Sequence, residues 1–255
     1  MTQNGADSKP AARTLARGLQ LLEIVARSPQ GAAVSDVAAE TGLDKGTVSR
    51  LLSALGQLGY VRQRPADRRY LLSGKVLVLA RSYEQQLNLR EVARPHLTAL
   101  RDTTRETVHL AVREGRQLIY VDQVEPDRSV RLASAIGQSL PLHVTAMGRA
   151  VLAALPRPEG DELAAQLVAD PHFADFVVDL GHVRDEVEHA RRHGWATVAR
   201  DDDVTRIGVA VLDATGEPVG AVSVSGPAYR VDEHVETHAA TCVAAARAIS
   251  AALGA

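Results

Sequence analysis

The sequence contains a single cysteine, Cys242, among its 255 residues. One cysteine excludes an internal disulfide framework and a cysteine-rich zinc site. Long hydrophobic runs are also missing, because none approaches the ~20 residues that a membrane helix needs. The first ten residues, MTQNGADSKP, are polar rather than signal-like. We therefore expect a soluble cytoplasmic protein with no membrane segment.

The length suits two domains, and the charges are divided unevenly along the chain. Hydrophobic residues make up 45% and charged residues 24%, which is an ordinary globular balance. Residues 1–75 contain 11 Lys and Arg against 6 Asp and Glu, whereas residues 76–255 contain 18 against 25. This split indicates that a basic N-terminal part meets a polyanion. Chance clustering would give the same split, so it counts only beside a nucleic-acid-binding motif.

The basic part has the helix spacing of a helix-turn-helix motif. Leucines at helical spacing predict a first helix over about 14–27. A second, short helix is expected to begin with Ser35 as its N-cap and to end at Gly42, where a left-handed residue is favoured. Asp44 is the expected N-cap of a third helix. The apolar stripe of that third helix is Val48, Leu51, Leu52, Leu55 and Leu58.

The opposite face of the third helix suits a DNA major groove, because it combines small hydroxyls with long cations. Its residues are Lys45, Thr47, Ser49 and Arg50. Two short strands around a turn follow, and they resemble a basic wing that contacts phosphates. The wing arginines are Arg62, Arg64, Arg68 and Arg69. Any one of them alone would be interpreted as a solvated surface charge. Because spacing, turn glycine, wing and charge split agree, we predict DNA binding.

The segment from TLARGLQLLEIVARS to RQRPADRRYLLS resembles the winged helix-turn-helix of the IclR family of transcriptional regulators. Three further blocks, TVHLAVREGRQLIYVDQVEP, LPLHVTAMGRAVLAALP and VGAVSVSGPAYRV, are similar to family blocks in the same order. The resemblance implies a homodimer or a dimer of dimers (a homotetramer) that binds a pseudo-palindromic operator and a small-molecule effector.

These patterns predict three parts: a winged helix-turn-helix domain over 11–73, a linker or dimerisation helix over 74–89, and an effector-binding domain over 90–255. The first half of the linker is too apolar to be freely solvated, so we expect it to pack against a partner. Helical and strand periods alternate from residue 90 onward, which favours an α+β fold with an antiparallel sheet. A strand is expected around Val130 and Leu132. The resemblance implies a GAF/profilin-like sheet.

Three features suggest where a ligand binds. Ser223 and Ser225 are two apart on a predicted strand, so both hydroxyls face the same side of the sheet. Their partner is a polar ligand or a neighbouring turn. The amides of Ala146, Met147 and Gly148 are expected at a helix N-terminus, where anions bind. Arg206 heads another strand, either as a ligand contact or as an exposed strand end.

The resemblance places the family's effector site at these same blocks. The serine pair and the 146–148 stretch match the family pattern, but Arg206 stands where the family often has cysteine. The acidic loop Asp201-Asp202-Asp203 is shorter than usual, so none of its residues is assigned to the effector. If Arg206 shares the side of the serine pair, we expect the effector to be a carboxylic acid, because a guanidinium clamps a carboxylate through two hydrogen bonds. An organic or aromatic acid is the favoured class.

An enzyme with a DNA-recruitment head is the alternative hypothesis. The sequence GAVSVSG lacks the G-x-S-x-G nucleophile elbow, and no phosphate-binding glycine loop or dinucleotide fingerprint is present. His189 and His193, like His234 and His238, have the spacing of zinc ligands. Neither pair has the H-E-x-x-H order, and solvated histidines are commoner on charged helix faces. We therefore expect no catalytic residues, no metal and no cofactor.

Overall fold

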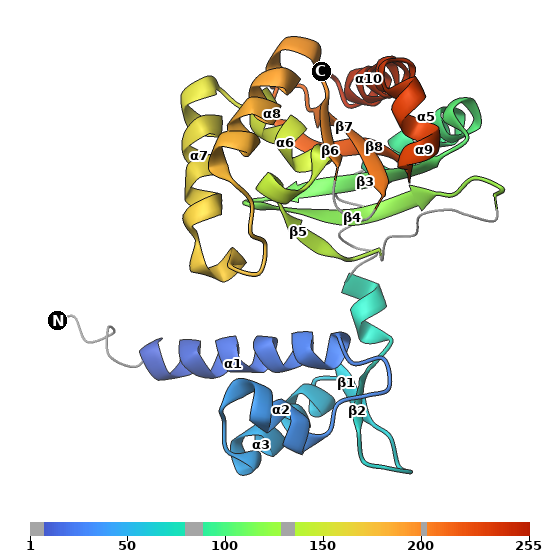
Figure 1. Cartoon of the computed structure of the whole chain (residues 1–255). Helices are drawn as coiled ribbons and strands as arrows, with labels where there is room; N and C mark the ends of the chain where they lie inside the picture. Colours follow the sequence, from blue (N-terminus) through green and yellow to red (C-terminus); the bar gives the residue numbers. More distant parts are fainter. Residues whose placement is uncertain (1–7, 80–88, 129–135, 200–202) are drawn as a thin grey trace. The chain divides into compact units, whose positions relative to one another are not determined.

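The computed structural model describes residues 8–79, 89–128, 136–199 and 203–255. The chain divides into two compact units, Met1–Gln86 and Leu87–Ala255 (Figure 1). Among the described residues, no helix has both the length and the apolar character needed to cross a bilayer.

The described part of the N-terminal unit contains three α-helices, a short helical segment over 75–79 and a small two-stranded antiparallel sheet. Its elements are α1 (Ser8–Ala26), α2 (Val34–Thr41), α3 (Lys45–Gln57), β1 (Val61–Gln63) and β2 (Tyr70–Leu72). An additional backbone bridge joins Ala32 to Tyr70 and adds a third short segment to the wing. The core of the unit consists of apolar residues from all three helices and both strands, including Leu21, Val25, Val37, Val48, Leu52, Leu55, Val61 and Tyr70.

Two predicted details of this unit are confirmed and two are wrong. Gly42 has a left-handed conformation (φ 68°) after α2, and the Asp44 side chain accepts a hydrogen bond from Thr47 N–H at 2.9 Å. Ser35 is not the N-cap of α2, because the bridge at Ala32 directs the chain into the helix two residues earlier than predicted, with Ala33 at the cap. Leu58 caps the end of α3 and is 59% exposed, so it lies outside the buried stripe.

The C-terminal unit is an α+β fold with an antiparallel sheet, as the sequence predicted. The described strands have the order β5-β4-β3-β8-β7-β6. Its strands are β3 (Thr107–Glu114), β4 (Gln117–Val124), β5 (Ser139–Pro141), β6 (Ala196–Ala199), β7 (Val204–Leu212) and β8 (Pro218–Pro227). Its α-helices are α5 (Leu89–Thr104), α6 (Ala146–Ala154), α7 (Arg157–Ala169), α8 (Leu180–His193), α9 (Ala228–Val231) and α10 (Val235–Ala252). Three single-turn 3-10 helices lie at Leu142–Val144, Pro171–Phe173 and Asp232–His234.

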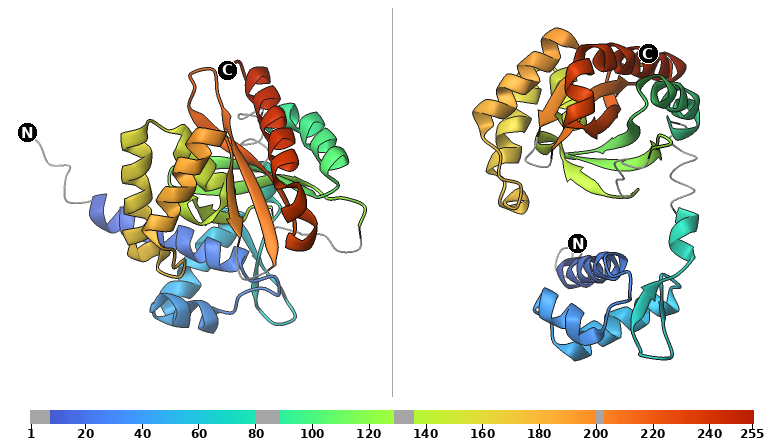
Figure 2. Two further views of the ribbon diagram at one scale, coloured as in Figure 1. Left: turned by 45° about the horizontal axis from the view of Figure 1, so that its top comes forward. Right: turned by 45° about the vertical axis from the view of Figure 1, so that its right-hand side comes forward.

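Helices cover both faces of the sheet. In Figure 2, α5 and α10 run side by side along one face. The opposite face packs against α6, and α7 and α8 complete that layer (Figure 1). Alternation along the strands explains this division: Val222 and Val224 face one layer, whereas Ala221, Ser223 and Ser225 face the other.

Some predicted elements fall outside the described residues. The strand expected around Val130 and Leu132 is one of them, and the described strand beside β4 is β5. Residues 75–79 are helical, in agreement with the predicted start of the linker, whereas residues 80–88 are not described. Leu77, Val78 and Leu79 are all more than half exposed.

Candidate functional site

The predicted base-reading residues occupy the first two turns of α3. The side chains of Lys45, Ser49 and Arg50 are exposed, and Thr47 is half-buried. Arg50 Nη2 donates a hydrogen bond to Thr47 Oγ1 at 3.1 Å, so these two side chains are arranged together. The Asp44 cap fixes the start of the helix beside them. The exposed face of α3 therefore combines two cations and two hydroxyls on one rigid element.

The four wing arginines divide into two pairs. Arg62 and Arg68 are exposed, and their side chains have no hydrogen bond or ion pair with the residues that the structure describes. Arg68 lies at the turn with φ 59°. A left-handed conformation costs a non-glycine residue roughly 1–2 kcal/mol, and such strain is concentrated at functional positions. These two arginines are available to a phosphate backbone.

Arg64 and Arg69 connect the wing to the loop between α1 and α2. Arg64 donates hydrogen bonds to both carboxylate oxygens of Asp67, at 2.8 and 2.6 Å, and to the carbonyl oxygen of Gln30 at 2.8 Å. Its hydrogen bonds lower the pKa of Asp67 to about 2. Arg69 donates to the carbonyl oxygen of Gly31 at 2.8 Å. Both arginines therefore have intramolecular partners that hold the wing in place.

In the C-terminal unit, the strand register brings the predicted effector residues onto one face. Arg206 on β7 lies directly opposite Ser225 on β8, and Gly208 lies opposite Ser223. Residues directly opposite each other in an antiparallel pair share a face of the sheet. Ser223 and Ser225 are 3% and 4% exposed. Arg206 thus lies on the same side of the sheet as the serine pair, which is the condition under which we expect a carboxylic acid as effector.

Arg206 is half-buried rather than an exposed strand end. Its Nη1 donates to the carbonyl oxygen of Val204 at 3.1 Å. Of the acidic loop, only Asp203 is described; it is exposed, and its carbonyl oxygen accepts a hydrogen bond from Ala228 N–H. Asp201 and Asp202 lie outside the described residues.

The N-terminus of α6 rests on the same face of the sheet. A Cβ atom on Gly208 would lie 2.3 Å from the backbone nitrogen of Met147, so only glycine allows this approach. The Gly148 N–H donates to the capping hydroxyl of Thr145 at 2.9 Å. The N–H groups of Ala146 and Met147 precede the first hydrogen bond inside the helix, from Arg149 N–H to the Thr145 carbonyl. Of the three predicted amides, Gly148 is thus already engaged.

His109 belongs to this face and was missed by the sequence analysis. It pairs with Ser223 across β3 and β8, and its Nδ1 is 3.4 Å from Ser223 Oγ. Burial, with a smaller contribution from the positive charge of Arg206, lowers the pKa of His109 to about 4. The available signal was a histidine inside an apolar strand, Val108-His109-Leu110, although the pairing with β8 cannot be read from that pattern.

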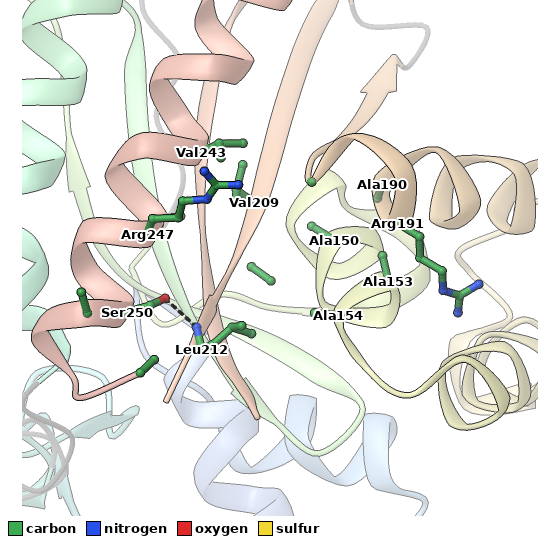
Figure 3. A pocket seen from close by; sticks show the side chains of 15 residues that line it. Ala150, Ala153, Ala154, Ala190, Arg191, Val209, Leu212, Val243, Arg247 and Ser250 are labelled. Carbon is green, nitrogen blue, oxygen red and sulfur yellow. Dashed lines mark hydrogen bonds between the residues drawn. The ribbon is translucent and has the colours of Figure 1, made fainter. Parts of the chain in front are cut away.

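A separate cavity of about 440 Å³ lies along β7 beyond the end of β6, between α10 on one side and α6 and α8 on the other (Figure 3). Alanine is its commonest lining residue, and none of the six predicted effector residues lines it. Arg191 is engaged with Asp161 at 2.8 Å, and Ser250 Oγ accepts a hydrogen bond from Leu212 N–H. Ligand sites usually combine apolar walls with convergent polar groups. The sheet face with the serine pair fits that description better.

The two histidine pairs lie apart from the serine face. The rings of His189 and His193 stack at 4.3 Å, and His189 also contacts Trp195 edge-on at 4.7 Å. The rings of His234 and His238 are 5.8 Å apart. Within the described residues, no group of three or more His, Cys, Asp or Glu is arranged to hold a metal ion.

Comparison with known proteins identifies the family. The model described as "IclR helix-turn-helix domain" matches residues 14–65, and "Bacterial transcriptional regulator IclR C-terminal" matches residues 81–251. The chain belongs to the IclR family of transcriptional regulators. The acetate operon repressor of Salmonella typhimurium is 30% identical over 96% of this chain and 95% of its own length.

Solved structures of IclR regulators share the fold. A putative transcriptional regulator from Rhodococcus sp. RHA1 has a TM-score of 0.75 at 29% identity, covering 94% of this chain and 98% of its own. An IclR homologue from Microbacterium hydrocarbonoxydans, solved in complex with 4-hydroxybenzoate, has a TM-score of 0.74 at 23% identity and the same coverage. The chain is a DNA-binding transcriptional regulator with an N-terminal helix-turn-helix domain and a C-terminal effector domain.

Proposed function

We propose that this IclR regulator reads its operator with α3 and holds the DNA backbone with the wing. Lys45, Thr47, Ser49 and Arg50 are the candidates for base contacts, because they lie on the exposed face of α3. Arg62 and Arg68 are the candidates for phosphate contacts. Arg64 and Arg69 support the wing from within, through Asp67, Gln30 and Gly31.

The proposed effector is a carboxylic acid bound on the sheet face of the C-terminal domain. The observation that carries this proposal is the position of Arg206, opposite Ser225 and on the side of Ser223. A buried carboxylate needs a paired cation and further hydrogen bonds to compensate for the loss of water. Arg206 supplies the cation, Ser225 supplies a hydroxyl donor, and Ala146 and Met147 supply N–H groups at a helix N-terminus, while Ser223 lies on the same side beside them. The 4-hydroxybenzoate complex of the Microbacterium homologue supports an aromatic acid as the first candidate.

A thermal-shift screen against organic and aromatic acids, followed by DNA footprinting with the acids that bind, tests the effector proposal. Arg206→Ala should abolish the response to the acid while leaving the fold and operator binding intact. Arg247→Ala is the matched control, because Arg247 is an exposed arginine that lines the separate cavity. Full acid affinity in Arg206→Ala would refute the guanidinium clamp.

We also propose that the chain forms a homodimer, or a dimer of dimers, on a pseudo-palindromic operator. Leu77, Val78 and Leu79 in the linker and Leu15 and Leu19 on α1 are all at least 51% exposed. Large apolar side chains exposed on these two elements support an interface with another chain. A second copy also raises operator affinity through effective concentration. Light scattering should show a dimer or tetramer; a monomer that binds the operator specifically would contradict this.

The proposed domain limits are 11–73, 74–89 and 90–255. We further propose that the chain regulates transcription without catalysis, since no nucleophile elbow accompanies its serines. A regulator that acts on bacterial chromosomal DNA works in the cytoplasm.

A further inference from the structure

His109 lies in the middle of the proposed effector site. On the sheet, His109, Ser223 and Gly208 form one row across β3, β8 and β7, which we call the Ser223 row. The adjacent Ser225 row contains Ser225 and Arg206. Two residues along a strand separate the rows, a distance of about 6.6 Å. The His109 side chain is 3% exposed, so it is part of the interior rather than the surface.

The two ring nitrogens of His109 have different surroundings. Nδ1 faces Ser223 Oγ at 3.4 Å. Nε2 is buried and has no hydrogen-bond partner within the part of the chain that the structure describes. The ring also packs edge-on against Tyr120, with centroids 5.5 Å apart, which fixes its plane. Because buried polar atoms in native proteins are nearly always paired, an unpaired Nε2 beside a candidate site points to a ligand.

The charge state of His109 determines whether Nε2 can act as a hydrogen-bond donor or acceptor. Burial and the nearby Arg206 guanidinium keep the pKa of His109 far below neutrality, so the ring is uncharged. A neutral imidazole carries one donor and one acceptor. We infer that the Ser223 hydroxyl donates to Nδ1, which requires the ring proton to be on Nε2. The proposed effector site then presents an N–H donor that lies one row along the sheet and two strands across from the backbone position of the cation.

We propose that His109 is a specificity-determining residue, whose Nε2–H donates a hydrogen bond to an uncharged second oxygen of the effector. This inference rests on the proposed binding of a carboxylate by Arg206 and Ser225; the one hydroxyl hydrogen of Ser223 is donated to His109. The ligand class follows from the separation of His109 and Arg206 on the sheet: a carboxylic acid with a hydroxyl or carbonyl oxygen several ångströms from its carboxylate. A site built to hydrogen-bond a ligand oxygen rejects the analogue that lacks it.

The test compares pairs of acids that differ by that one oxygen, benzoate with 4-hydroxybenzoate and butyrate with 4-hydroxybutyrate, by calorimetric titration of the full-length protein. In at least one of the two pairs, wild type should bind the hydroxy acid about 10-fold or more tightly than the acid that lacks the hydroxyl. His109→Leu should bring that ratio close to 1. His109→Gln should retain most of the preference, since its side-chain amide places an N–H donor near the Nε2 position. His189→Gln, which removes another buried unpaired Nε2 away from the site, should behave as wild type.

The outcomes separate this inference from the proposed function. Acid binding that needs Arg206 but keeps the same ratio in His109→Leu would overturn the role of His109 alone. Failure of all four acids to bind wild type would overturn the carboxylate proposal and this inference with it. Nitrogen-15 spectra of the histidine rings give a check without any acid. A proton on Nδ1 of His109 would overturn the inference, because Nε2 would then have no hydrogen to donate.

Discussion

Replacing His109 should remove a defined part of the pH dependence of the effector domain. The pKa of His109 is lowered to about 4 by burial and by Arg206, whereas an unfolded histidine has a pKa of about 6.5. Between these values the unfolded chain takes up a proton that the folded domain excludes. Stability is therefore complete above pH 6.5 and falls as the pH decreases toward 4. Linkage gives a loss of ~1.8 kcal/mol in the free energy of unfolding between pH 7 and pH 5 from this one group.

The assay is urea unfolding at pH 7 and pH 5, followed by tryptophan fluorescence. Trp195 is the only tryptophan in the sequence and is buried in the C-terminal unit, so its signal reports on that unit. The loss between the two pH values should be ~1.8 kcal/mol larger for wild type than for His109→Gln, because the other titrating groups are common to both. A difference below about 0.5 kcal/mol would show that the folded protein protonates His109 nearly as easily as the unfolded chain does.

Three further predictions concern the wing, the packing of α6 and the cysteine. Arg62→Ala and Arg68→Ala should each reduce the slope of log K for DNA binding against log salt concentration by about 0.9 for each phosphate that the arginine neutralises in wild type. Arg64→Ala should mainly speed proteolysis of the wing. Equal slopes in all variants would contradict this division. Gly208→Ala should destabilise the effector domain by ~1–3 kcal/mol or more, since the new Cβ meets the backbone of Met147. Gly18→Ala is the control: its Cβ lies in open space on α1 and should stabilise that helix by up to ~1 kcal/mol. Burial raises the pKa of Cys242 to about 12, so thiol reagents at pH 8 should label it only after unfolding, and rapid labelling of the folded protein would refute this.

Local patterns in the sequence were sufficient for the DNA-binding domain. Asp44 caps α3 and Gly42 ends α2 because capping depends on a few adjacent residues, which the sequence displays directly. Ser35 failed as a cap because a distant residue, Tyr70, bonds to Ala32 and moves the start of the helix. Local rules cannot include such a contact.

The arrangement of the candidate effector site was predictable only in part, for the same reason. The two-residue period placed Ser223 and Ser225 on one side of β8 without any knowledge of the sheet. Their neighbours depend on strand order, and β8 lies between β3 and β7, which are distant from each other in the sequence. His109 could therefore be assigned to the candidate site only once the strand order was known. The partners of Arg64 and Arg69 are tertiary contacts of the same kind.

Charge balance restricts the acids that the proposed site would accept. Among the described residues proposed to bind the effector, Arg206 is the only cation, because His109 remains uncharged. One carboxylate neutralises one guanidinium, and a second carboxylate would bring a buried negative charge without a partner, at a cost of several kcal/mol. Monocarboxylates should therefore bind more tightly than dicarboxylates of the same length. On this proposal the second polar group of the effector has to be neutral, and a neutral oxygen would accept the hydrogen bond that we propose His109 Nε2–H donates.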